Sequence, residues 1–284
     1  MTSEAHPLVI DSTLEIAARL LAWGKGHQDG WCSVEQAARL RDASGDDMNL
    51  AMGRWRRQLS VLLRERPEVR VVIEGADGYP ANLSSVSGRP SMLFVDGTIL
   101  TRDHQALAVV GSRKVEEAAA AAAADIGSRL ALLGYTVVSG LARGVDTAGH
   151  KGALAAGGRT IAVVGTGIDE VFPPENGGLV SRIRRSGALV SQFPPGYGPT
   201  KTTFPARNAV IAGLSLGSIV VTASERSGTR IEIDRTLAQG RPVFLWKPFL
   251  GHDAWARRLA ADPLVHLVGS VDEIDDIVRR TSRA

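Results

Sequence analysis

Short apolar and β-branched runs alternate with longer stretches of helical pattern from about residue 106 onward. A run such as 161–164 is apolar at every position, as expected of a strand that helices cover on both faces of a parallel sheet. The runs predict strands over 106–110, 135–138, 160–164, 188–191, 218–221, 242–246 and 265–268. Their alternation with helices indicates an α/β fold: an extended, Rossmann-like, doubly wound sheet with mainly parallel strands.

Upstream of residue 76 the apolar residues recur at helical spacing instead. Ser12 and Ser33, each three residues ahead of a glutamate or glutamine, are typical capping-box starts. A third helix is predicted over 48–64 and a strand over 70–74. Three helices and a strand are the elements of a winged helix, which would read duplex DNA. A compact module that only packs on a larger domain is the commoner case, and we prefer it.

These patterns divide the chain into two expected domains. Residues 1–76 form a small helical N-terminal module, with a winged helix as the open alternative, and residues 77–284 form the Rossmann-like domain. The segment 79–97 is rich in turn-forming residues, so we expect it to lead into the sheet.

The composition is that of an ordinary globular protein and excludes few functions. Hydrophobic residues make up 44% of the 284 residues and charged residues 22%, as in ordinary globular proteins. The single cysteine, Cys32, cannot form an internal disulfide, which favours the cytoplasm. No signal peptide or membrane-length apolar run is visible, so no membrane partner is expected. The net charge of +3 permits nucleic acid as a partner without requiring it.

The candidate chemistry lies in the loops after the predicted strands, because ligands of open α/β sheets bind beyond the carboxyl ends of the strands. The first strand is followed by Gly111, Ser112 and Arg113. Glycine lets backbone N–H groups approach an anion, and arginine adds a two-pronged phosphate donor. A plain tight turn would explain Gly111 but not Arg113, so we interpret this turn as a phosphate site.

The turn after the second strand has the same character. It contains Ser139, Gly140 and Arg143, which we add to the candidate phosphate-binding residues. Asp146 follows at the expected start of a helix, where it would cap the helix and pair with Arg143.

The turn after the fifth strand holds Ser227, Gly228 and Thr229, which offer N–H and hydroxyl donors at a helix start. All of these turns lie at the same edge of the predicted sheet, so they can surround one pocket. No G-x-G-x-x-G motif follows the first strand, and therefore no nicotinamide or flavin cofactor is expected.

The loop between the fourth and fifth strands combines cations with an aromatic ring. Lys201, Phe204 and Arg207 fall within seven residues at the start of a predicted helix. A cation for phosphate and a ring for a base are what single-stranded nucleic acid requires. An alternative of equal weight makes Phe204 a hydrophobic staple of its helix and Arg207 a surface residue.

The sequence gives weaker evidence for catalytic residues than for a binding site. His150 falls within a predicted helix, where a structural role is expected, and no close spacing of histidine and cysteine indicates a metal site. We therefore expect a binding protein and not an enzyme, with no metal and no cofactor.

A set of motifs occurs in a fixed order along the chain: Tyr79-Pro80, Gly111-Ser112-Arg113, 139–144, 160–167, 204–208, 211–214 and Ser227-Gly228. As a set, over roughly residues 79–246, it resembles the DNA-processing protein A (DprA, or Smf) family. The resemblance implies an extended Rossmann fold that binds single-stranded DNA, forms a homodimer and helps to load the RecA recombinase in natural transformation. It also implies that the DNA pocket is lined by Arg113, Lys201, Phe204, Arg207 and Asn208.

The chain departs from the pattern of this family at several positions. Gln192 and Thr222 stand where the family usually has glutamates, and Ala209 stands where it has a second arginine. The chain also ends soon after Arg280, without the C-terminal winged helix of many members. The resemblance is therefore to a divergent member.

A second resemblance keeps a different function open. Gly228-Thr229 followed by Glu232 is similar to the G-T-x-x-E motif of Lonely guy phosphoribohydrolases, in which a glutamate helps to cleave an N-glycosidic bond. Arg226 and Ser227, however, replace the glycine pair that those enzymes place before this motif. A nucleotide-binding protein or a nucleoside-monophosphate phosphoribohydrolase is the alternative to a DNA-binding protein.

Overall fold

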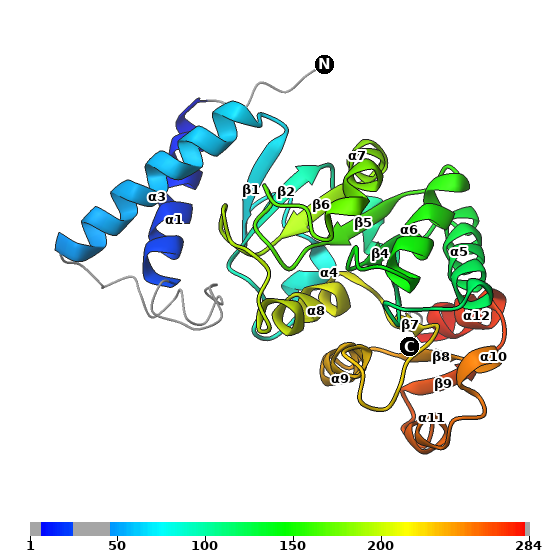
Figure 1. Cartoon of the computed structure of the whole chain (residues 1–284). Coiled ribbons are helices and arrows are strands. Elements are labelled where there is room, and N and C mark those ends of the chain that lie inside the picture. Colours follow the sequence, from blue (N-terminus) through cyan, green and yellow to red (C-terminus); the bar gives the residue numbers. More distant parts are fainter. Residues whose placement is uncertain (1–6, 25–45, 282–284) are drawn as a thin grey trace.

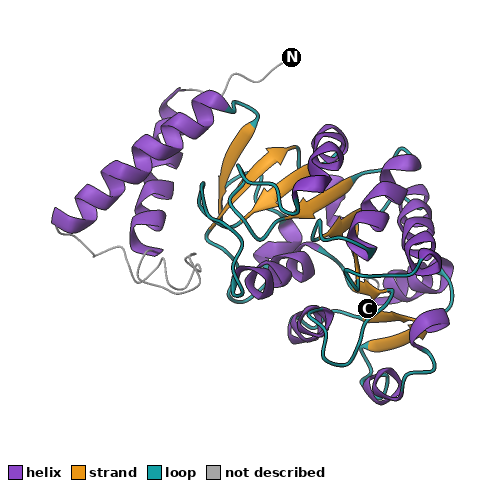
Figure 2. Ribbon diagram, in the orientation of Figure 1, coloured by secondary structure: helices purple, strands orange, loops and turns teal. Residues whose placement is uncertain are grey.

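The computed structural model describes residues 7–24 and 46–281, and there it shows one sheet of nine strands between layers of helices (Figures 1 and 2). The strands lie in the order β1-β2-β6-β5-β4-β3-β7-β8-β9. Their bounds are β1 (Val69–Ile73), β2 (Met92–Gly97), β3 (Ala106–Val110), β4 (Thr136–Ser139), β5 (Thr160–Val163), β6 (Ala188–Ser191), β7 (Ser218–Val220), β8 (Val243–Trp246) and β9 (Val265–Val268). β2 pairs antiparallel with β1 and β6, and the other neighbours pair parallel, which confirms the predicted fold class.

The strands predicted from residue 106 onward are all present. Those expected over 106–110, 188–191 and 265–268 have the predicted bounds, and the others differ by one residue at one or both ends. Their apolar runs predicted burial on both faces, and β3 shows it, because every residue of that strand is buried. Its successive side chains contribute to different apolar clusters on the two faces of the sheet, as the pleat requires.

β2 is a strand that the sequence pattern did not predict. It lies in the segment 79–97, which was expected only to lead into the sheet. Its apolar run, 92–95, is short and is flanked by turn-forming residues, so local pattern is weak there. Pairing with β1 on one side and β6 on the other determines the strand, and all its residues except Gly97 are buried.

Helices cover both faces of the sheet. On one face the apolar core includes residues of α4 (Ala81–Ser84), α8 (Thr203–Leu214), α9 (Thr229–Ala238), α10 (Lys247–Leu250) and α11 (Ala254–Leu259). On the other face it includes residues of α5 (Glu117–Leu132), α6 (Val145–Ala155), α7 (Gly177–Ser186) and α12 (Val271–Thr281). No helix in the described ranges is both long enough and apolar enough to cross a bilayer.

Two helices, α1 (Pro7–Gly24) and α3 (Asp46–Glu65), pair with each other beside the β1 edge of the sheet (Figure 1). The third predicted helix is confirmed as α3. The predicted start at Ser12 is wrong, because α1 already begins at Pro7, and proline suits the first position of a helix. The start predicted at Ser33 lies outside the described residues. β1 pairs with the large sheet, and the division of the chain at residue 76 stays a prediction.

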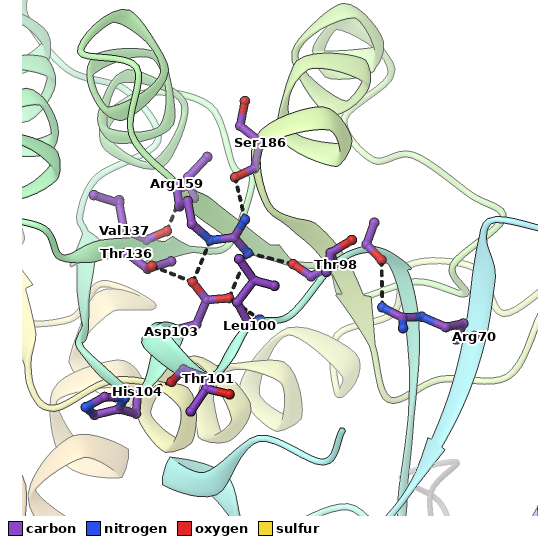
Figure 3. A network of polar contacts seen from close by, with 12 residues as sticks. Arg70, Thr98, Leu100, Thr101, Asp103, His104, Thr136, Val137, Arg159 and Ser186 are labelled. Atoms are coloured by element: carbon purple, nitrogen blue, oxygen red, sulfur yellow. Dashed lines mark hydrogen bonds and ion pairs between the residues drawn. The ribbon is translucent and has the colours of Figure 1, made fainter. Parts of the chain in front are cut away.

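Arg159 ties the segment before β3 to the central strands (Figure 3). Its guanidinium donates to both carboxylate oxygens of Asp103, at 2.8 and 2.7 Å, and to the carbonyl oxygens of Thr98 and Ser186, at 2.6 and 3.1 Å. Thr136 Oγ1 donates to the same carboxylate at 2.6 Å. Burial alone would raise the pKa of Asp103, but these hydrogen bonds hold it below its ordinary value.

Candidate functional site

A cavity of about 540 Å³ lies beyond the carboxyl ends of β3 and β7. The turn after β3, the first turns of α8 and the start of α9 surround it. The predicted site residues that line it are Gly111, Ser112, Arg113, Phe204, Arg207, Asn208, Ser227, Gly228 and Thr229. Turns that are far apart in the sequence therefore meet at one edge of the sheet, where open α/β sheets bind their ligands.

The turn after β3 fits tightly between neighbouring loops. A Cβ atom at Gly111 would lie 2.9 Å from the carbonyl oxygen of Thr222, so the backbone there needs glycine. Ser112 N donates to the same carbonyl oxygen at 3.0 Å. This fixed backbone holds Arg113 and Lys114 exposed at the rim of the cavity. Lys114 was not predicted as a site residue, although its position next to Arg113 was a signal.

Phe204 is the centre of a cluster of rings and cations. The guanidinium carbons of Arg113 and Arg207 lie 5.0 and 5.9 Å from the centre of its ring, within the range of cation–π contacts. The ring of Phe172 is 6.0 Å away and tilted by 48°. Phe172 is 39% exposed and was not among the residues predicted from the sequence. Its only signal was an aromatic residue beside two prolines in the loop after β5.

Arg207 is buried and lines the cavity, so the alternative that made it a surface residue is wrong. It is only 5% exposed, and its Nη1 donates to the carbonyl oxygens of Gly140 and Val163, the latter at 2.7 Å. Its Nε donates to Asn208 Oδ1 at 3.1 Å. These hydrogen bonds join the ends of β4 and β5 to α8. Arg207 therefore fixes the position of α8 at the inner wall of the cavity.

Asp146 also differs from its expected role. Its carboxylate accepts from the backbone N–H groups of Gly140 and Ala142, at 3.2 and 3.3 Å. The expected pair with Arg143 is wrong, because Arg143 is exposed and pairs with Glu175. Asp146 is buried and stabilises the turn after β4 through these two backbone hydrogen bonds.

Two buried carboxyl groups, Asp146 and Glu232, lie against the cavity near Arg207. Burial raises the pKa of Asp146 to about 6 and that of Glu232 to about 8, although Arg207 acts in the opposite direction on both. Glu232 Oε1 accepts from Ser218 Oγ at 3.5 Å, and its Oε2 has no partner among the described residues. At neutral pH Glu232 is thus mostly protonated and adds little negative charge to the cavity.

The other predicted site residues do not line the cavity. Ser139 is buried and its Oγ donates to the carbonyl oxygen of Val109 at 2.6 Å, while Gly140 supplies a carbonyl to Arg207. Arg143 and Lys201 are exposed, Lys201 in the loop that leads into α8. The first two shape the backbone of the site, and the other two lie outside it.

His150 is a buried structural residue. Its Nδ1 is 2.6 Å from Thr160 Oγ1, and burial lowers its pKa to about 3, so the ring is neutral. Within the described ranges, no three histidine, cysteine or acidic side chains gather in a way that would hold a metal ion.

Comparison with known proteins gives a consistent set of relatives. The family described as DNA recombination-mediator protein A matches residues 70–265. DNA processing protein DprA of Streptococcus pneumoniae is 42% identical over 168 residues, which are 59% of each chain. Protein Smf of Escherichia coli is 39% identical over 181 residues, which are 63% of this chain and 48% of that protein. The chain thus matches about half to three-fifths of the length of these curated relatives.

Solved structures show the same fold. The X-ray structure of Streptococcus pneumoniae DprA superposes with a TM-score of 0.69 at 30% identity and covers 92% of both chains. The DprA structure from Helicobacter pylori, a protein described as binding single-stranded DNA, superposes with a TM-score of 0.66 at 20% identity. It covers 75% of this chain and 97% of that one.

Proposed function

The chain belongs to the DNA recombination-mediator protein A family, and we propose that it binds single-stranded DNA in the cavity at the carboxyl edge of its sheet. The observation that carries the proposal is the contact between Arg113 and Phe204, which places an exposed guanidinium directly beside an aromatic face. Single-stranded nucleic acid needs both, a cation for the backbone and a ring for a base.

Phosphate is bound by the rim of the cavity. Arg113 and Lys114 supply positive charge from the turn after β3, and Thr229 offers a hydroxyl donor at the start of α9. Ser227 lines the cavity, but its N–H and its hydroxyl both donate to the carbonyl oxygen of Ser224, at 3.0 and 2.8 Å. A helix start favours anions because its first N–H groups are free and its dipole is positive there. These contacts fix the strand without reading its sequence.

Bases stack on the aromatic part of the cluster. The Phe204 ring lies within 6 Å of two guanidinium carbons, and Phe172 beside it is exposed to a second base. Stacking on such a ring contributes about 1–3 kcal/mol per base, and it tolerates every base because each has a flat face. The protein therefore holds single strands with little sequence preference.

The same geometry supports binding without a chemical step. Glu232, which would be the catalytic carboxylate of a phosphoribohydrolase, is 2% exposed and adjoins the buried Arg207 network. Arg226 and Ser227 replace the glycines that such an enzyme places before its motif. Release of free base from nucleoside monophosphates, abolished by Glu232→Gln, would refute the non-enzymatic proposal.

The DNA-binding proposal is tested by a salt titration of a fluorescent oligothymidylate. Each lost phosphate contact lowers the log–log salt slope by about 0.7, so Arg113→Ala should lower the slope by about this amount and weaken binding. Arg257→Ala, which removes an exposed charge from α11, should leave the slope unchanged. Absence of wild-type binding at low salt would overturn the proposal.

Beyond binding, we place the protein in DNA uptake and recombination in the cytoplasm, acting as a homodimer with a RecA-type recombinase as partner. Family membership is the support for this wider role. Light scattering tests the dimer. Loading of recombinase onto strands coated with single-strand-binding protein tests the partner, and no increase in loading would contradict this part of the proposal.

A further inference from the structure

The face of α3 that points away from the core carries a stripe of arginines. Arg54, Arg57 and Arg64 are separated by three and seven residues, which places them along one side of a helix. All three are exposed, whereas Leu59 and Leu62, on the opposite side, are buried against the N-terminal part of the core. We call these three arginines the α3 stripe.

The α3 stripe is not neutralised within the described part of the chain. No ion pair there involves any of its three arginines, and the helix has no acidic residue between Leu50 and Arg64. Arg56, on another side of the helix, is the one that faces Glu15, at 4.0 Å. The stripe therefore offers positive charge to solvent over roughly 15 Å of helix, given the rise of about 1.5 Å per residue.

The helix that carries the stripe contacts the loop that leads into the proposed DNA site. Gln58, between Arg57 and Arg64 on α3, donates from Nε2 to the carbonyl oxygen of Pro195 at 3.3 Å. Pro195 lies in the loop between β6 and α8, which continues through Lys201 to Phe204. In Figure 1 this yellow-green loop lies on the side of the sheet nearest α1 and α3.

The loop is held in place from both sides, so this neighbourhood is a fixed feature of the fold. The ring of Tyr197 stacks on Phe193 with 5.6 Å between centres. Gly196 N donates to the Asp169 carboxylate at 2.9 Å, and Gly167 N donates to the Tyr197 carbonyl oxygen at 2.7 Å. The loop therefore runs from its contact with α3 at Gln58 to the cavity at Phe204, with Lys201 exposed between them.

We propose that the α3 stripe is a second contact surface for the same single strand that occupies the cavity. The proposal rests on the proposed function, because the strand is continuous with the one bound at Phe204. Phosphates follow one another at about 3.4 Å per nucleotide in a stacked strand, so a stripe of about 15 Å faces several of them. The N-terminal helices thereby lengthen the binding site instead of only packing on the sheet.

The test compares oligothymidylates of two lengths, about 6 and about 30 nucleotides, because single-strand sites on OB-fold proteins span about 4–16 nucleotides. The variant Arg54→Ala/Arg57→Ala/Arg64→Ala should bind the short oligonucleotide like wild type. On the long one its salt slope should fall by about 2, and its affinity at 0.1 M salt by up to about 100-fold. Arg113→Ala should weaken both lengths.

Two further variants control for folding and for net charge. Replacing the same three positions by lysine keeps the charge and should retain the wild-type slope. Arg182→Ala/Arg185→Ala/Arg257→Ala removes three exposed charges from α7 and α11 and should bind both lengths like wild type. Melting curves verify that each variant is folded.

Three results would overturn the inference. Wild-type slope and affinity of the stripe variant on the long oligonucleotide would reject the stripe while leaving the cavity proposal intact. Loss of duplex binding alone, with single-strand binding unchanged, would assign the stripe to duplex DNA. Failure of the wild type to bind either length would reject the proposed function and the stripe together.

Discussion

Arg113 lies over the ring of Phe204 with 5.0 Å between the guanidinium carbon and the ring centre, and this contact joins the turn after β3 to the start of α8. The guanidinium remains exposed at the cavity rim. The pair therefore presents a phosphate donor and a stacking surface side by side, and the two functions can be separated by mutation.

Phe204→Ala should weaken oligothymidylate binding by about 5- to 150-fold, which corresponds to the 1–3 kcal/mol expected of one base stacked on a ring. The ring carries no charge, so the salt slope should change by much less than the 0.7 or so expected of a lost phosphate contact. Phe204→Trp, which keeps a ring, is the control and should retain most of the affinity. Fluorescence anisotropy at several salt concentrations measures both quantities, and wild-type affinity of Phe204→Ala would contradict the stacking role.

Arg207→Ala should destabilise the protein by roughly 3–5 kcal/mol, because it leaves buried carbonyl and carboxyl groups without their cation. Arg113→Ala, at an exposed position, should change the free energy of unfolding by no more than about 0.5 kcal/mol. Urea unfolding followed by circular dichroism compares the two. If Arg207→Ala were as stable as Arg113→Ala and still lost DNA binding, Arg207 would be a direct phosphate ligand.

Much of the fold could be predicted because strands buried on both faces, such as β3, leave short runs that are apolar at nearly every position. β2 was not predicted, because its pairing with β1 and β6 determines the strand and its own apolar run is short. Local pattern carries no information about such distant partners.

The candidate site could be predicted in outline for a similar reason. Strand order brings the turns after β3 and β7 to one edge, so their small and basic residues meet at the cavity, whereas Arg143 in the turn after β4 lies outside it. The direction of each side chain could not be predicted. Arg207 and Arg113 look alike in the sequence, but one is buried among carbonyl groups and the other is exposed, which only packing decides.

Gly144→Ala should displace the turn that carries Arg113. Gly144 has φ of +73°, and a Cβ atom there would press on the carbonyl oxygen of Ser112. Such strain costs about 1–3 kcal/mol, so both the melting temperature and the affinity for oligothymidylate should fall. Gly178→Ala in α7 is the matched control, since nothing lies within 4 Å of the added Cβ and alanine favours helix. Equal affinity of the two variants would show that the turn tolerates a side chain at Gly144.

Arg159→Leu should destabilise the protein by roughly 3–5 kcal/mol near neutral pH, because Asp103 is then buried without its cation. The pKa of Asp103 is lowered in the fold, so its contribution is present above its ordinary value of 3.8 and is lost as pH falls through the lowered value. The gap in unfolding free energy between wild type and variant should therefore narrow in acid. Arg102→Leu, at an exposed position nearby, should have little effect at any pH. A constant gap across the acid range would contradict the ion-pair explanation.

Glu232 should make DNA binding sensitive to pH on the alkaline side of neutrality. Burial raises its pKa to about 8, so the neutral form predominates at pH 7 and a negative charge appears at the cavity wall above pH 8. If only the neutral form accepts phosphate, affinity for oligothymidylate should be about fourfold lower at about pH 8.5 than at pH 7. Glu232→Gln should remove most of this difference.

The same group should also affect stability with a defined sign. Its pKa in the fold lies above the ordinary value of 4.5, so between these two values the folded protein holds a proton that the unfolded chain releases. The contribution of Glu232 to the free energy of unfolding is thus complete below pH 4.5, falls as pH rises, and is lost above about pH 8. Because burial raises the pKa of Asp146 only to about 6, the difference between wild type and Glu232→Gln in urea unfolding from pH 7 to 8 reports the contribution of Glu232. A wild-type decline across that interval, absent in Glu232→Gln, is the expected result. Parallel curves for the two proteins would mean that Glu232 is already ionised in the fold, and its negative charge would then face every phosphate that enters the cavity.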